Sequence, residues 1–80
     1  MLDPLLREPQ VTAATGKSRS SLWLEIKGGL FVPGVKIGRR SIRWPQSEVA
    51  RIIRARIAGQ SDGEIKALVA ELVTARKQFR

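Results

Sequence analysis

The sequence contains no cysteine and no histidine among its 80 residues. Without cysteine the chain forms no disulfide and offers no thiolate, and without histidine it lacks the commonest metal ligand and general base. The seven acidic residues form no spaced pair suited to two-carboxylate chemistry, and no glycine loop with a phosphate-binding lysine occurs. We therefore expect neither an enzyme nor a protein that depends on a metal or cofactor.

Long apolar runs are also missing. No run in the chain is long enough to cross a bilayer, and the N-terminal MLDPLLREPQ lacks the basic-then-apolar order of a secretion signal. Eighty residues make one small domain, which buries only about 60% of its unfolded surface and leaves little room for an enclosed active site. We expect a soluble cytoplasmic protein with no membrane partner.

Positive charge is what the chain has in excess. Fifteen Lys and Arg residues face seven Asp and Glu residues, for a net charge of +8. Seven basic residues and one acid, Glu25, fall between Lys17 and Arg43, so this window carries six of the eight net charges. Such clustering in a folded domain predicts a polyanionic partner.

The first half of the chain predicts two short helices after a brief strand at 5–7. Pro9 suits the first turn of a helix over 8–15 with Val11 and Ala14 turned inward, and Gly16 ends it. Ser18 offers an N-cap oxygen to a second helix over 19–27, which Gly28 and Gly29 stop. Two helices joined by about three residues containing glycine match the helix-turn-helix arrangement.

The segment 30–44 changes from the helical period to alternation. Apolar residues alternate there with Lys36, Ser41 and Arg43, which is typical of a half-buried β-hairpin with the apolar side chains inward (Val35, Ile37, Ile42 and Trp44). Gly38, Arg39 and Arg40 form the predicted tip. Adjacent arginines repel each other, so their presence at a tip next to a helix-turn-helix predicts a DNA-contacting wing.

The remaining sequence predicts two more helices. The first begins at Pro45 and runs to Ala58 with an apolar stripe (Val49, Ile52, Ile53 and Ile57), and Gly59 closes it. Ser61 and Glu64 form a capping box ahead of the second, which reaches about Gln78 and carries its own stripe (Ile65, Leu68, Val69, Leu72 and Val73). We expect a mostly α fold with a small β-hairpin: a winged helix-turn-helix over 1–59, and over 60–80 a helix that packs on the core or mediates dimerisation.

Double-stranded DNA is the partner that this arrangement predicts, with the helix over 19–27 in the major groove. Trp23 either packs on the hairpin or lies against the sugar-phosphate backbone, and Ser18 is better explained as a helix cap than as a base reader. The candidate DNA-binding residues are Lys17, Ser18, Arg19, Ser20, Ser21, Trp23, Lys27, Lys36, Arg39, Arg40 and Arg43.

An ordered set of motifs carries a family resemblance. Val11 followed by ATGKSRSSLW, then LFVPGVKIGRRSIRWPQSEV, resembles the AlpA-like regulators of prophages and integrated elements, which are similar to excisionase and MerR-type winged-helix domains. The resemblance covers about residues 5–59. Two departures stand out: Lys17 follows Gly16 where the family usually has an aliphatic residue, and Leu24-Glu25 reverses the expected polar-then-apolar order.

The resemblance implies a sequence-specific DNA-binding regulator of a prophage or mobile element. Such a protein either controls transcription of excision and integration genes or acts as an architectural excision factor that bends DNA beside integrase. An adaptor that binds a partner protein through its last helix is a further alternative. Integrase, RNA polymerase and a second copy of the chain are the protein partners that these alternatives imply.

Overall fold

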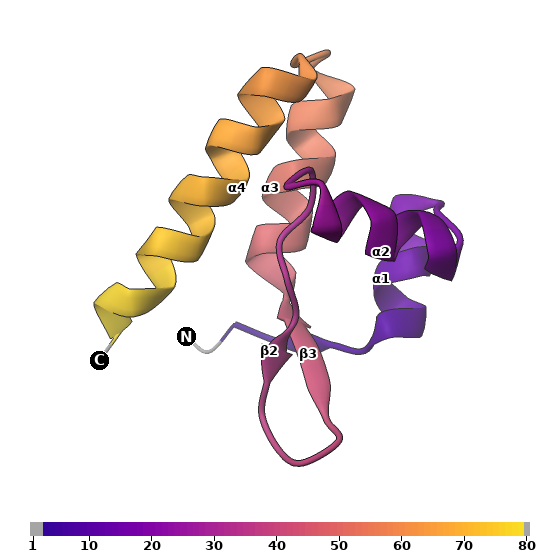
Figure 1. Cartoon of the computed structure of the whole chain (residues 1–80), viewed down its shortest axis with the longest axis vertical. Coiled ribbons are helices and arrows are strands. Elements are labelled where there is room, and N and C mark those ends of the chain that lie inside the picture. The colour runs from indigo at the N-terminus through magenta and orange to yellow at the C-terminus, as the bar shows by residue number, and fades with distance from the viewer. Residues whose placement is uncertain (1–2, 80) are drawn as a thin grey trace.

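The computed structural model describes residues 3–79, which form four α-helices and a small sheet whose hairpin projects away from the helices (Figure 1). The elements in chain order are β1 (Leu5–Leu6), α1 (Glu8–Thr15), α2 (Arg19–Lys27), β2 (Val35–Lys36), β3 (Ile42–Pro45), α3 (Gln46–Ile57), α4 (Asp62–Arg76) and a 3₁₀ turn (Lys77–Phe79). The helix-turn-helix, the hairpin and the two C-terminal helices predicted from the sequence are confirmed.

Local signals at the helix ends explain why these segments start and stop where they do. Gly16 ends α1 in the left-handed conformation at φ 72°, which residues with a side chain rarely adopt. The Ser18 hydroxyl accepts from the backbone N–H of Ser21 and caps α2. The backbone N–H of Ser61 donates to the Glu64 carboxylate, which holds the pKa of Glu64 below its usual value and completes the capping box of α4.

The three strands form an antiparallel sheet in the order β1-β3-β2. β3 is central: its residue Trp44 lies opposite Leu6 of β1, and its residue Arg43 lies opposite Val35 of β2. The chain before α1 is therefore joined by backbone hydrogen bonds to the base of the hairpin. This pairing fixes where α1 begins relative to the hairpin.

Trp44 is the largest side chain of the core and is fully buried. Its indole Nε1 donates to the carbonyl of Val32 at 3.0 Å. Gly34 passes so close to β3 that a Cβ there would lie 2.1 Å from Ile42 Cγ2 and 3.1 Å from Trp44 Cζ2. The segment that enters the hairpin can lie against β3 only because residue 34 has no side chain.

The C-terminal helix α4 packs lengthwise against α3 (Figure 1). Ile65 and Val69 of α4 are buried in the same cluster as Trp44. Arg76 at the end of α4 donates to the Glu48 carboxylate of α3 at 2.6 Å and to the carbonyl of Pro33 at 2.8 Å. The last helix is thus attached both to α3 and to the segment that enters the hairpin.

Four apolar residues do not face the core as predicted. Ala14 and Ile57 are exposed, the latter at 80%, because α1 and α3 bury narrower faces than their stripes suggested. Ile37 and Ile42 are 51% and 40% exposed. Because Val35 lies opposite Arg43 and Lys36 lies opposite Ile42, Ile37 shares the face of Val35 and Ile42 the face of Trp44, so the hairpin has no single inward face. α4 ends at Arg76, and the expected continuation to Gln78 forms the 3₁₀ turn instead.

No helix within residues 3–79 is long and apolar enough to span a membrane.

The Arg76–Glu48 contact yields a stability prediction. Arg76→Met leaves the largely buried Glu48 carboxylate without a partner, so the free energy of unfolding in urea should fall by about 2 to 3 kcal/mol, somewhat less than for a fully buried pair. Lys77→Met, which removes the same charge from an exposed neighbour, is the matched control and should change stability by under about 0.5 kcal/mol. Equal effects of the two substitutions would show that the ion pair does not attach α4 to α3.

Candidate nucleic-acid interface

Four ion pairs occur among residues 3–79; three join two helices, and the fourth joins the turn before α2 to α2 itself. They are Lys17–Glu25 at 2.8 Å, Arg19–Glu8 at 3.0 Å, Arg56–Asp62 at 3.0 Å and Arg76–Glu48 at 2.6 Å. None of these four involves a residue of the hairpin. The acids therefore neutralise cations in the helical part of the molecule and leave the hairpin positive.

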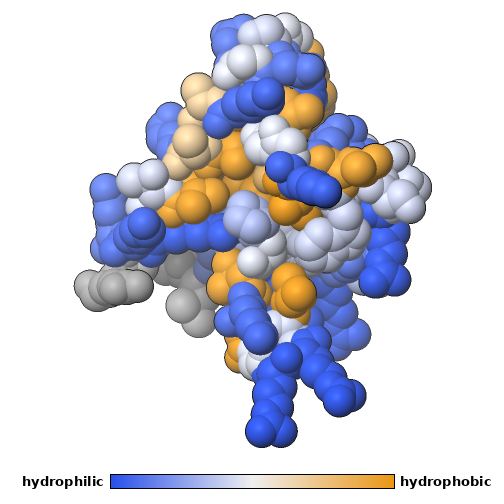
Figure 2. Space-filling model, viewed as in Figure 1, coloured by the Kyte–Doolittle hydropathy of each residue, from blue (hydrophilic) through white to orange (hydrophobic). Residues whose placement is uncertain are grey.

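The tip of the hairpin is closed by a hydrogen bond from the backbone N–H of Ile37 to the carbonyl of Ser41, at 2.9 Å. Gly38, Arg39 and Arg40 form the exposed turn between them. Figure 2 shows hydrophilic side chains projecting from this end of the molecule, below apolar side chains nearer the core. The tip can therefore present two guanidinium groups to an anion without displacing any acidic partner.

Two more cations lie on the strands behind the tip. Lys36 is exposed on β2, and Arg43 is half-buried on β3, where its Nη1 donates to the carbonyl of Ile42 at 3.0 Å. Because Lys36 pairs with Ile42 and Arg43 pairs with Val35, the two cations leave opposite faces of the hairpin. The hairpin is basic on both faces as well as at its tip.

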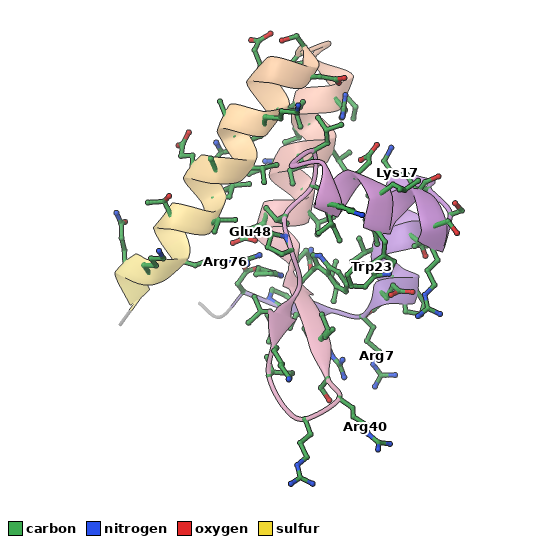
Figure 3. The ribbon with its side chains drawn as sticks, viewed as in Figure 1. Arg7, Lys17, Trp23, Arg40, Glu48 and Arg76 are labelled. Carbon is green, nitrogen blue, oxygen red and sulfur yellow. The ribbon has the colours of Figure 1, made fainter. Side chains whose placement is uncertain are left out.

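Arg7 is a candidate that the sequence interpretation missed. It is exposed and follows β1, so continuing the pairing of Leu6 with Trp44 by one residue brings Arg7 beside Arg43. Figure 3 shows the Arg7 side chain directed toward the same end of the molecule as that of Arg40. The signal in the sequence was the apolar Leu5-Leu6 pair, which marked a strand able to pair with the hairpin.

The side chain of Glu8, next to Arg7, contacts two residues of α2. Its carboxylate accepts from Trp23 Nε1 at 2.9 Å and pairs with Arg19 Nε at 3.0 Å. Arg19, whose side chain is 78% exposed, is thereby held at the end of α1 where Arg7 lies. Glu8 thus joins Arg19 of the second helix to the start of α1, next to Arg7.

Trp23 has a packing role. Its ring meets that of Trp44 edge-to-face, with centroids 5.9 Å apart and planes at 68°. Together with the hydrogen bond to Glu8, this contact answers the question that the sequence left open: Trp23 packs on the hairpin strand β3, although 37% of it remains exposed.

The exposed face of α2 is a strip defined by three residues at i, i+4 and i+7: Ser20, Leu24 and Lys27. We call it the outer strip. It lies opposite Leu22, which is fully buried. Ser18 and Ser21 flank the strip, and their hydroxyls are engaged with each other at 3.1 Å, as expected of a cap. Ser20 is thus the serine of α2 best placed to contact a ligand.

Lys17 lies apart from the hairpin end. In Figure 3 it sits on the side of α2 remote from Arg40, and its Nζ contacts Glu25 at 2.8 Å with both side chains mostly covered. These two departures from the family pattern lie close together in the structure. Lys17 pairs with Glu25, and Leu24 beside Glu25 is exposed.

The helix-turn-helix, the basic hairpin and the sheet order are those of a winged helix-turn-helix domain. Residues 4–57 match the family described as prophage CP4-57 regulatory protein (AlpA), so the chain belongs to that family of prophage regulators. The match ends at the last residue of α3, and α4 lies outside it.

One relative comes from a phage. The uncharacterized protein ORF88 of Enterobacteria phage P4 is 40% identical over 58 residues, which cover 72% of this chain and 66% of the phage protein. The chain therefore spans slightly less than two thirds of that relative. No solved structure matches the chain significantly.

The Lys17–Glu25 pair generates a second prediction. Lys17→Ile or Glu25→Leu alone leaves one mostly covered charge unpaired, so each should lower the free energy of unfolding by about 1 kcal/mol or more. The double variant restores an apolar contact and should be at least as stable as the natural chain, as measured by urea denaturation of all four proteins.

The more exposed pair Arg56–Asp62 supplies the control for this cycle. Replacing it by Met and Asn should give a coupling energy of only a few tenths of a kcal/mol. If the changes in the free energy of unfolding caused by Lys17→Ile and Glu25→Leu simply add, the two charges do not compensate each other. The Lys17–Glu25 contact would then not stabilise the protein.

Proposed function

We propose that the protein binds double-stranded DNA in a sequence-specific manner and thereby regulates genes of a prophage or mobile element. The observation that carries the proposal is the set of cations at the hairpin end that have no ion-pair partner among residues 3–79: Arg7, Lys36, Arg39, Arg40 and Arg43. They adjoin a short helix whose outer strip is covered by no other element of the described chain. Membership of a prophage regulator family supports the same function.

In the proposed complex, α2 enters the major groove with its N-terminal end leading. That groove is about 12 Å wide and accepts one α-helix. Arg19 contacts the major-groove edge of a guanine, where an arginine can donate to both O6 and N7. Ser20 donates to a neighbouring base or to a phosphate. Glu8 acts as a positioning residue, because its carboxylate limits where the Arg19 guanidinium can reach.

The hairpin is the wing of this complex. Each guanidinium or ammonium that neutralises a phosphate releases a condensed counterion, which favours binding strongly at low salt. If all five hairpin-end cations take part, the logarithm of the binding constant should fall against the logarithm of salt concentration with a slope of about −4.5. Arg39 and Arg40 at the tip are also suited to a narrow minor groove, where the potential is most negative.

The wing assignment is tested by that slope. Arg39→Ala combined with Arg40→Ala should weaken binding to all duplexes and flatten the slope by about two units, as measured by fluorescence anisotropy across a salt series. Arg51→Ala combined with Arg54→Ala removes the same charge from the exposed side of α3, where both arginines lie beside α4. This control should leave the slope within about half a unit of the natural value. A wing variant that behaves like the control would remove the hairpin from the interface.

Control of transcription is the regulatory role we favour, with architectural excision beside integrase as the alternative. Burial of Ile65 and Val69 in the core weakens the case for an adaptor that binds a partner through the stripe of α4. Integrase, RNA polymerase and further copies of the chain remain proposed partners on DNA.

The two regulatory roles predict different footprints. A transcriptional regulator should protect one compact site at a promoter in DNA flanking its own gene. An excision factor should instead protect several sites in phase with the helical repeat at an attachment site, and circularly permuted fragments should reveal a bend. Nuclease footprinting with the full chain distinguishes these outcomes. Absence of any protected site in that DNA would contradict both roles.

A further inference from the structure

The most exposed apolar side chain on the proposed DNA-binding helix is Leu24. It is 70% exposed, although leucine is among the residue types most often buried. It lies opposite the fully buried Leu22, so the packing of α2 does not require an apolar residue at position 24. A single exposed leucine is ordinary on a protein surface, but this one occupies the centre of the outer strip.

The neighbours of Leu24 on the strip are polar. Ser20 lies one turn before it and Lys27 one turn after it, and all three are exposed. The strip thus offers a hydroxyl, a branched alkyl group and an ammonium in order along the helix. In addition, Glu25 is engaged with Lys17 on the inner side of α2, so the apolar residue of the Leu24-Glu25 dipeptide is the exposed one.

The major groove contains one apolar group for such a side chain. Thymine carries a C5-methyl at its edge, whereas guanine, adenine and cytosine present hydrogen-bonding atoms there. A leucine placed against guanine or cytosine would desolvate donors and acceptors without pairing them, which is unfavourable. An exposed leucine at the centre of a groove-entering strip is therefore best matched by thymine.

We propose that Leu24 is a specificity-determining residue that packs on the C5-methyl group of a thymine. Ser20 then contacts a neighbouring base or phosphate, and Lys27 contacts a phosphate. This inference rests on the proposed function, because it requires α2 to enter the major groove. It assigns to Leu24 a preference for T·A pairs that the arginines of the interface cannot provide, since arginine reads guanine.

The test begins by selecting duplexes from a randomised pool with the full chain. Each thymine of the selected site is then replaced singly by deoxyuridine, which lacks the methyl group but keeps the same hydrogen-bonding edge. At one or two positions the natural protein should bind the uridine duplex about three- to five-fold more weakly, as expected for losing one buried methyl-sized group. Leu24→Ala should bind the thymine and uridine duplexes equally at those positions.

Ile57→Ala is the matched control, because Ile57 is also exposed, at 80%, but lies at the end of α3. It should keep the full difference between thymine and uridine. Circular dichroism should show both variants folded, since neither side chain is part of the core cluster.

The outcomes separate the two levels of the proposal. If no duplex is enriched, the proposed function fails and this inference falls with it. If duplexes are enriched but no uridine substitution weakens binding, or Leu24→Ala keeps the methyl dependence, DNA binding stands and the role of Leu24 is overturned. A Leu24→Ala variant that changes only the number of chains per duplex would assign Leu24 to a contact between copies, which also overturns the inference.

Discussion

The burial of Trp44 is the interaction on which the other features depend. Its indole is fully enclosed and bonded to Val32, its strand pairs with β1 and β2, and its ring meets the edge of Trp23 on α2. In a domain with so few large side chains, one residue therefore fixes three elements relative to one another. Since Leu6 pairs with Trp44, the same residue also sets the position from which Arg7 projects.

Charge in this protein is distributed by the need to fold as well as by function. Each of the acids Glu8, Glu25 and Glu48 meets a cation on another element or turn, and these pairs connect α1 to α2, the turn to α2, and α3 to α4. Repulsion among the fifteen basic residues would otherwise oppose compaction. With these acids engaged in the helical part, the basic residues of the hairpin end have no acidic partner among the described residues, and a polyanion would relieve their repulsion.

Local features of the fold were predictable from sequence, and distant ones were not. Caps such as Ser18 and Ser61 act within one turn, so they located the starts of α2 and α4. Contacts such as Arg76 with Glu48 join residues far apart in the chain, and no local pattern indicates them. The inward side of the hairpin was wrong at Ile37 and Ile42, because alternation gives the faces of each strand but not the register between the two strands, which puts these residues on opposite faces. Of the candidate interface, the tip arginines were evident in the sequence, whereas Arg7 and Leu24 required the sheet register and the helix faces.

The Lys17–Glu25 ion pair and the exposed Leu24 connect the stability of α2 to its proposed role in recognition. A helix of nine residues has one inner and one outer side, so a charge accepted on the inner side must be paired there. Lys17 and Glu25 meet that requirement with each other. Position 24 is then free of any packing requirement, because its side chain lies outside the core. A residue with no packing requirement at the centre of an exposed strip can be replaced without loss of the fold, so a role in recognition at position 24 does not compete with stability.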